Sequence, residues 1–162
     1  MGRIGQDLAR RLEPFKVQIS YSGPNAKNLP YTYHQDIKDL AKNSDVLFLA
    51  CPATPDTDKM INAEVLDALG PTGFLINIAR GSVVDEGALL YALQHKKIAG
   101  AALDVFENEP NLNTAFLNLD NVLLTPHIGS ATAETRIAMT NLAIDNLEAF
   151  FAQQPLLTEV HH

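Results

Sequence analysis

Three ionisable side chains follow apolar segments of this sequence: Arg80, Glu109 and His127. Arginine binds a carboxylate through two parallel hydrogen bonds, and histidine gives and takes protons near neutral pH. A carboxylate beside the histidine stabilises its charged form. The set fits the reduction of a carbonyl next to a carboxylate. Arg80 would hold the acid and polarise the carbonyl, His127 would protonate its oxygen, and Glu109 would orient His127, while a nicotinamide supplies the hydride.

Each of these residues also has an ordinary structural interpretation. Arg80 could be a surface residue in a turn. Glu109 precedes Pro110 and could be a solvated loop acid, and His127 could be a turn histidine. Their shared position after strands favours the functional interpretation. With right-handed crossovers, the carboxyl ends of parallel strands lie at one edge of the sheet, where ligands bind, so residues far apart in sequence can meet there.

The elements that would position these residues alternate between strand and helix. Apolar runs predict the strands, while a capping Asn62 and an acidic start at Asp85 or Glu86 predict two of the helices. The predicted strands are residues 17–21, 45–51, 74–79, 100–106 and 121–126. The predicted helices are residues 4–12, 36–42, 63–69, 87–94 and 131–154, and residues 24–33 and 111–120 are expected to be loops. This order predicts an α/β fold with a doubly wound parallel sheet.

A second set of residues points to a dinucleotide cofactor. Gly2 and Gly5 open the first predicted helix with the spacing of the last part of the G-x-G-x-x-G fingerprint, although two glycines alone equally suit close helix packing. The fingerprint expects a carboxylate about 20 residues later, at the end of the next strand, to bind the ribose hydroxyls. Ser22 stands there instead, and Lys27 follows. The missing carboxylate favours NADP over NAD, with a simply solvated Lys27 as the alternative.

Composition limits the other classes of function. The chain has 162 residues and a net charge of −7, which gives no electrostatic support to a nucleic-acid partner. No apolar run approaches the roughly 20 residues that cross a bilayer, and no signal peptide is visible, so no membrane partner is expected. A single cysteine, Cys51, excludes a disulfide framework and agrees with a cytoplasmic setting. We assign no metal site.

Five runs of the sequence resemble the coenzyme domain of the D-isomer-specific 2-hydroxyacid dehydrogenases. They are residues 2–5, 52–57, 77–86, 100–110 and 125–130. The resemblance implies catalytic roles for Arg80, Glu109 and His127. It also implies cofactor contacts, to the pyrophosphate by Arg3 and Ile4 and to the nicotinamide amide by Asp104. Together with Gly2, Gly5 and Ser22, the expected cofactor set then includes Cys51, Thr57, Ile78, Ala79 and Gly129.

The resemblance carries expectations about substrate and organisation as well. Ser22 in place of the ribose-binding acid resembles the hydroxypyruvate and glyoxylate reductases, where NADP is common, so a small 2-oxo or 2-hydroxy acid is the expected substrate. Members of the family also carry a substrate domain, for which this chain has no room. Their dimers pack largely through the coenzyme domain, so we expect a homodimer.

The first strand of the dinucleotide-binding fold is not found in the sequence, and in that fold it is central. We therefore expect a gap between strands 17–21 and 45–51. We also expect residues 1–154 to form an N-terminally truncated NAD(P)-binding, Rossmann-like domain, followed by a tail at 155–162. Such a fragment should bind cofactor poorly and be inactive alone. A non-catalytic NAD(H)-sensing corepressor-like module, or a dimerisation module, is the alternative function, because such relatives can keep all three candidate catalytic residues.

Overall fold

The computed structural model describes residues 1–160, and residues 161 and 162, which end the predicted tail, lie outside the described part. The chain forms two compact units, Met1–Pro126 and a second that begins at His127. The domain limit predicted at residue 154 stays a prediction.

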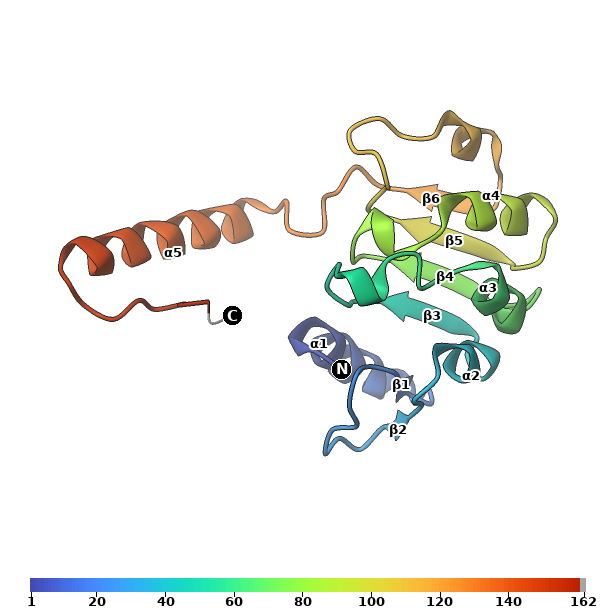
Figure 1. The fold of residues 1–162 in the computed structure, drawn as a ribbon, viewed down its shortest axis with the longest axis horizontal. Coiled ribbons are helices and arrows are strands. Elements are labelled where there is room, and N and C mark those ends of the chain that lie inside the picture. The colour runs from blue at the N-terminus through green and yellow to red at the C-terminus, as the bar shows by residue number, and fades with distance from the viewer. Residues whose placement is uncertain (161–162) are drawn as a thin grey trace. The chain divides into compact units, whose positions relative to one another are not determined.

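Four parallel strands form the main sheet of the first unit, in the order β3-β4-β5-β6 (Figure 1). They are β3 (Val46–Leu49), β4 (Phe74–Asn77), β5 (Gly100–Leu103) and β6 (Val122–Leu124). Leu49, Asn77 and Leu103 are neighbours in the register, so the carboxyl ends of β3, β4 and β5 are level. This arrangement confirms the predicted α/β fold with a parallel sheet and places its strand ends along one edge.

Three helices cover one face of this sheet (Figure 1). They are α2 (Ile37–Lys42), α3 (Ala63–Leu69) and α4 (Glu86–Gln94). A polar side chain at the start of each helix accepts hydrogen bonds from first-turn N–H groups, and the three caps are Asp36, Asn62 and Asp85. Gly70 ends α3 with a φ of 79°, a left-handed conformation that glycine adopts at little cost. The predicted cap at Asn62 and the helix start at Asp85 are therefore confirmed.

The core of the first unit lies between these helices and the sheet, and every second strand residue points into it. Leu49 and Leu75 are buried there together with Leu66 of α3. The intervening strand residues point to the opposite face, where Phe74 and Leu123 are exposed. Apart from Asn77, both sets are apolar, as is usual for parallel strands, which are commonly buried on both faces.

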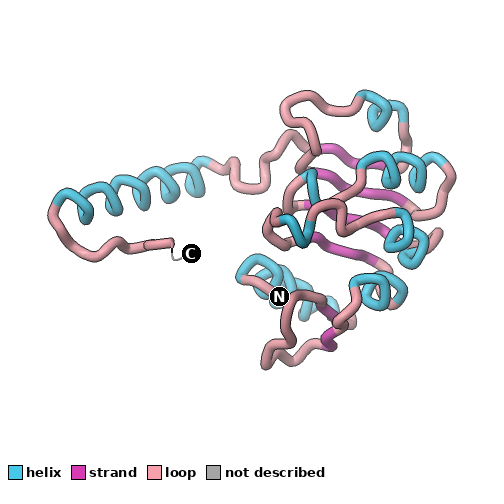
Figure 2. The backbone as a smooth tube through the Cα atoms, viewed as in Figure 1, coloured by secondary structure: helices cyan, strands magenta, loops and turns pink. Residues whose placement is uncertain are grey.

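A second, two-stranded sheet follows helix α1 (Arg3–Leu12). Its strands are β1 (Ser20–Tyr21) and β2 (Thr32–Tyr33), and Figure 2 shows them apart from the main sheet. The strand predicted at 17–21 is thus shorter, and the loop predicted at 24–33 was wrong at residues 32 and 33, because β2 pairs with β1 across a long loop. The break between β1 and β3 confirms the expected gap in the sheet.

The second unit is built on one long helix, α5 (Ala133–Phe151), which is slightly shorter than the predicted 131–154. The Thr132 side chain caps it by accepting a hydrogen bond from the Thr135 N–H. The segment after the helix is tied back to it, because Asn146 Nδ2 donates to Thr158 Oγ1 at 3.0 Å and the Thr158 N–H donates to Asn146 Oδ1 at 3.2 Å. Across residues 1–160, none of the helices has the length and hydropathy that crossing a bilayer requires.

Candidate functional site

The turn that carries Arg80 is fixed by the buried side chain of Asn77, the last residue of β4. Asn77 is 1% exposed, its Oδ1 accepts a hydrogen bond from the Ala79 N–H at 3.0 Å, and its Nδ2 donates to the Arg80 carbonyl at 3.0 Å. One amide thus satisfies two backbone groups that the end of the strand leaves without ladder partners. Sequence reasoning gave Asn77 no role, although a polar residue inside an apolar strand was a usable signal.

The Arg80 turn packs directly against the loop that follows β5. Gly81 is buried, and a Cβ atom at this position would overlap the backbone of Phe106 and Glu107. Only glycine therefore allows this close approach. The Arg80 side chain is exposed and its Nη1 donates to the Ala79 carbonyl at 2.6 Å. The guanidinium is thereby held at the carboxyl edge of the sheet, where solvent or a ligand can reach it.

Carboxylates fix the loop after β5, which contains Glu109. Glu109 Oε1 accepts a hydrogen bond from the Phe106 N–H at 2.9 Å, and Glu86 Oε1, at the start of α4, accepts one from the Glu107 N–H at 2.8 Å. Lys59 Nζ lies 3.6 Å from Glu107 Oε1. Because Phe106 also abuts Gly81, the loops that carry Arg80 and Glu109 pack against each other, while a shared site for the two side chains stays a prediction.

The third candidate, His127, is the first residue of the second unit and has a φ of 52°, in the left-handed region that few non-glycine residues adopt. The strand end that leads to it is well fixed in the first unit. Thr125 Oγ1 donates to Asp104 Oδ1 at 2.6 Å, and the Thr125 N–H donates to the Leu103 carbonyl at 2.9 Å. The meeting of His127 with Arg80 and Glu109 stays a prediction, and so does the cofactor role of Gly129, which also lies in the second unit.

The start of α1 has the features of a phosphate-binding helix end. Gly2 occupies the N-cap without a side-chain hydrogen bond, so the N–H groups of the first turn have no capping side chain. A Cβ at Gly2 would meet nothing within 4 Å, which leaves open space at this helix end. The helix has ten residues, and its N-terminal dipole favours an anion. Gly2, Arg3, Ile4 and Gly5 thus lie at an uncapped helix start, and their contact with a pyrophosphate stays a prediction.

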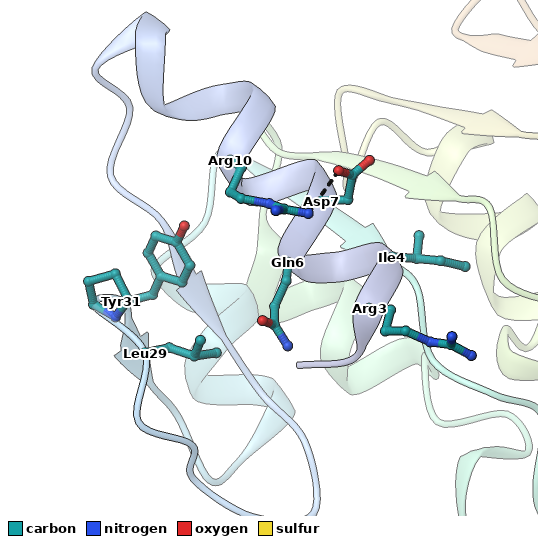
Figure 3. Close-up of a pocket in the computed structure, with 8 residues that line it drawn as sticks. Arg3, Ile4, Gln6, Asp7, Arg10, Leu29 and Tyr31 are labelled. Carbon is teal, nitrogen blue, oxygen red and sulfur yellow. Dashed lines mark hydrogen bonds and ion pairs between the residues drawn. The ribbon is translucent and has the colours of Figure 1, made fainter.

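A hollow of about 730 Å³ lies beside the same helix (Figure 3). In Figure 3, the ends of the Arg3 and Ile4 side chains project away from the loop that carries Leu29 and Tyr31. Arg10 and Asp7, which both line the hollow, form an ion pair at 3.0 Å. The lining residues are Arg3, Ile4, Gln6, Asp7, Arg10, Leu29, Pro30 and Tyr31.

The loop after β3 holds two of the other predicted cofactor residues, Cys51 and Thr57. Thr57 Oγ1 donates to the Pro52 carbonyl at 2.8 Å and accepts from the Thr54 N–H at 2.8 Å, so the loop is cross-linked by its own side chains. Burial raises the pKa of the Cys51 thiol. The thiol therefore stays protonated at neutral pH, which suits a contact residue and not a nucleophile.

The remaining predicted cofactor residues of the first unit follow other strands. Ser22 is half-buried directly after β1, and Asp104 is half-buried after β5. Ile78 and Ala79 follow β4, where Ile78 is 40% exposed and Ala79 is buried. The Ala79 N–H and carbonyl are both used, by Asn77 and Arg80. An apolar contact through Ile78 is thus more accessible to a ligand than one through Ala79.

Replacing Asn77 with alanine is expected to lower the free energy of unfolding by about 1–3 kcal/mol, because the buried Ala79 N–H loses its partner and the Arg80 carbonyl keeps only the Val83 N–H. Urea denaturation measures the change. Asn43→Ala is the matched control, since the Asn43 side chain also donates to a carbonyl, that of Asp39, but at an exposed position. Equal midpoints for the two variants would show that Asn77 does not hold this turn.

Comparison with known proteins points to one family. The sequence model of the D-isomer specific 2-hydroxyacid dehydrogenase, NAD binding domain, matches residues 1–129. Hydroxyphenylpyruvate reductase of Plectranthus scutellarioides is 52% identical over 161 residues, which are 99% of this chain and 51% of that protein. 2-Ketogluconate reductase of Gluconobacter oxydans is 52% identical over 160 residues, 98% of this chain and 52% of that protein.

One solved structure is also similar to the chain, with nearly the same sequence identity. It is the NADPH-dependent glyoxylate/hydroxypyruvate reductase from Sinorhizobium meliloti in complex with NADP and malonate, with a TM-score of 0.96 and 51% identity. The similarity covers 98% of this chain and 50% of that one. The chain thus spans about half the length of the relatives that it matches.

Proposed function

Because the chain belongs to the D-isomer-specific 2-hydroxyacid dehydrogenase family, we propose that it is the coenzyme-binding half of an enzyme that reduces 2-oxo acids to D-2-hydroxy acids. The observation that carries the proposal is the Arg80 turn. Asn77 fixes this turn at the carboxyl edge of the parallel sheet, and Gly81 packs it against the loop of Glu109. A cation held at this edge suits an anionic substrate bound beside a dinucleotide.

The residues present fit a dinucleotide cofactor. The uncapped start of α1 would hold its pyrophosphate, and Ser22 with Lys27 would lie toward the ribose of the adenosine half. NADP is the favoured form, since no carboxylate follows β1 and a similar reductase was solved with NADP. When bound, the nicotinamide supplies the hydride for the reduction.

The three candidate catalytic residues would each have a separate role in the reduction, namely substrate binding, proton donation and orientation of the proton donor. Arg80 binds the substrate carboxylate through its planar guanidinium and polarises the neighbouring carbonyl. His127 would donate a proton to the carbonyl oxygen, which becomes the hydroxyl oxygen of the 2-hydroxy acid. Glu109 would stabilise the charged imidazole of His127 and orient it. These side chains would already be in place when charge develops on the carbonyl oxygen in the transition state.

The proposal also covers the substrates, the oligomeric state, the location and the partners of the protein. Small 2-oxo acids such as glyoxylate and hydroxypyruvate are the proposed substrates. Similar proteins from Sinorhizobium meliloti and Arabidopsis thaliana are both named as glyoxylate/hydroxypyruvate reductases. A homodimer and a cytoplasmic location are proposed from the family resemblance and the composition, with neither nucleic acid nor membrane as a partner. No observation on the described residues favours the non-catalytic alternative.

Steady-state NADPH oxidation tests the proposed function. The complete reductase that contains this chain is expected to turn over glyoxylate or hydroxypyruvate at about 1–10³ s⁻¹, the ordinary range of enzymes. The chain of 162 residues by itself is the control and is expected to be inactive. A complete protein that binds NADPH but oxidises it with none of these acids would overturn the proposal.

A further inference from the structure

A single buried hydroxyl group holds the backbone of Lys27. Tyr21, the last residue of β1, is 4% exposed, and its hydroxyl oxygen accepts a hydrogen bond from the Lys27 N–H at 2.7 Å. The same hydroxyl donates to the Lys27 carbonyl at 3.1 Å. Both backbone groups of Lys27 are therefore fixed by one side chain six residues earlier in the sequence.

A second tyrosine anchors the other end of the same loop. Tyr33 of β2 is paired with Tyr21 in the parallel register, and their ring centroids lie 5.3 Å apart at an interplanar angle of 51°. The Tyr33 hydroxyl donates to the Gly23 carbonyl at 3.0 Å. The loop of residues 22–27 is thus closed at both ends by two tyrosines that pack on each other, which we call the tyrosine clamp.

The clamp presents one cation beside the start of α1. Lys27 is the only charged residue in the loop of residues 22–27, and its side chain is exposed. Within residues 1–160 its ammonium group takes part in none of the ion pairs. A Cβ at Gly23 would lie 3.4 Å from the Met1 nitrogen, two residues before the start of α1 at Arg3. The loop and Lys27 therefore lie next to the proposed pyrophosphate site.

We propose that Tyr21 is a positioning residue for cofactor selection, because it holds Lys27 where its ammonium group binds the 2′-phosphate of NADP. The inference rests on the proposed function, since it deepens the cofactor site described above. Without the clamp, a loop that contains glycine, proline and asparagine would have to be ordered when the cofactor binds, and that entropy would be subtracted from the affinity. The tyrosine clamp orders the loop before the cofactor binds, so this entropy is not lost on binding. Only NADP benefits, because only NADP has the 2′-phosphate that Lys27 would contact.

Dissociation constants for NADPH and NADH, measured by fluorescence titration of the complete reductase, test the inference. Tyr21→Phe keeps the ring but removes the hydroxyl, and is expected to raise the Kd for NADPH about 5–10-fold while the Kd for NADH changes less than about twofold. Lys27→Ala is expected to raise the Kd for NADPH roughly 10–100-fold. In the double variant, the loss of the hydroxyl should add nothing to the effect of Lys27→Ala, because both act through one contact.

Tyr31→Phe is the matched control. Its hydroxyl donates a hydrogen bond to Glu13 Oε1 at 2.7 Å, and Glu13 lies outside the loop of residues 22–27. The inference is overturned if Tyr21→Phe weakens NADH as much as NADPH, if its effect is additive with that of Lys27→Ala, or if Tyr31→Phe has the same effect. Selective loss of NADPH binding in a protein that reduces no 2-oxo acid would support the clamp and count against the proposed function alone.

Discussion

Replacing Arg80 with lysine in the complete reductase is expected to lower kcat/KM for a 2-oxo acid by about 10²–10³-fold, with the Kd for NADPH unchanged. In the proposed mechanism, the guanidinium would offer two parallel donors to the substrate carboxylate and would stabilise the developing charge on the carbonyl oxygen. Lysine keeps the charge but loses the fork geometry. Asn77 and Gly81 hold the backbone of the turn, so the side-chain change leaves its position intact. Steady-state kinetics and NADPH titration measure the two quantities.

Arg11→Lys is the control for this variant. Arg11 is an exposed arginine on α1 that pairs with Asp7 at 3.0 Å, and an exposed pair of this kind contributes little. Its kinetics are expected to stay within about twofold of the wild type. If Arg80→Lys behaved like Arg11→Lys, Arg80 would not be the residue that binds the substrate.

Replacing His127 with glutamine is expected to lower kcat by about 10²–10⁴-fold, which is the usual contribution of a general acid. Glutamine can still donate a hydrogen bond to the carbonyl oxygen but has no proton to transfer. The KM for the 2-oxo acid should change much less, because in the proposed mechanism Arg80, and not His127, would make the main contact with the bound substrate. Stopped-flow measurement of NADPH oxidation in a single turnover separates this chemical step from product release.

His95→Gln is the corresponding control. His95 lies at the end of α4, is exposed, and its Nδ1 is 2.9 Å from the Tyr91 carbonyl oxygen. Its single-turnover rate is expected to stay within about twofold of the wild type. A single-turnover rate of His127→Gln equal to that of His95→Gln would remove His127 from the proposed mechanism.

Local signals in the sequence were sufficient for much of the fold. Asn62 and Asp85 are caps whose function depends on residues two or three positions away, so their helices could be predicted from the neighbouring sequence. The break between β1 and β3 followed from the known order of strands in a dinucleotide-binding sheet. The strand at residues 32 and 33 was missed, because it exists only through its pairing with β1, and no local periodicity marks two residues.

The residue types of the candidate site could be predicted from the sequence. The side chains that hold their loops in place by hydrogen bonds could not. Arg80 and Glu109 could be placed on neighbouring loops because consecutive parallel strands bring their carboxyl ends together. The roles of Asn77, Tyr21 and Thr125 depend on side-chain hydrogen bonds whose geometry is set only once the chain folds. A polar residue in an apolar strand or a buried tyrosine hydroxyl indicates that some partner exists, but its identity comes from the three-dimensional structure.

Transfer of deuterium from NADPH, labelled at the position that donates the hydride, tests the central claim most directly, namely that this chain binds the coenzyme of a 2-oxo acid reductase. The complete reductase is expected to convert glyoxylate or hydroxypyruvate into a 2-hydroxy acid with deuterium on the carbon that bears the hydroxyl, and the product from hydroxypyruvate should have the D configuration. Mass spectrometry and chiral chromatography of the product measure both. A product without deuterium on that carbon, or unreacted 2-oxo acid beside bound NADPH, would contradict the claim.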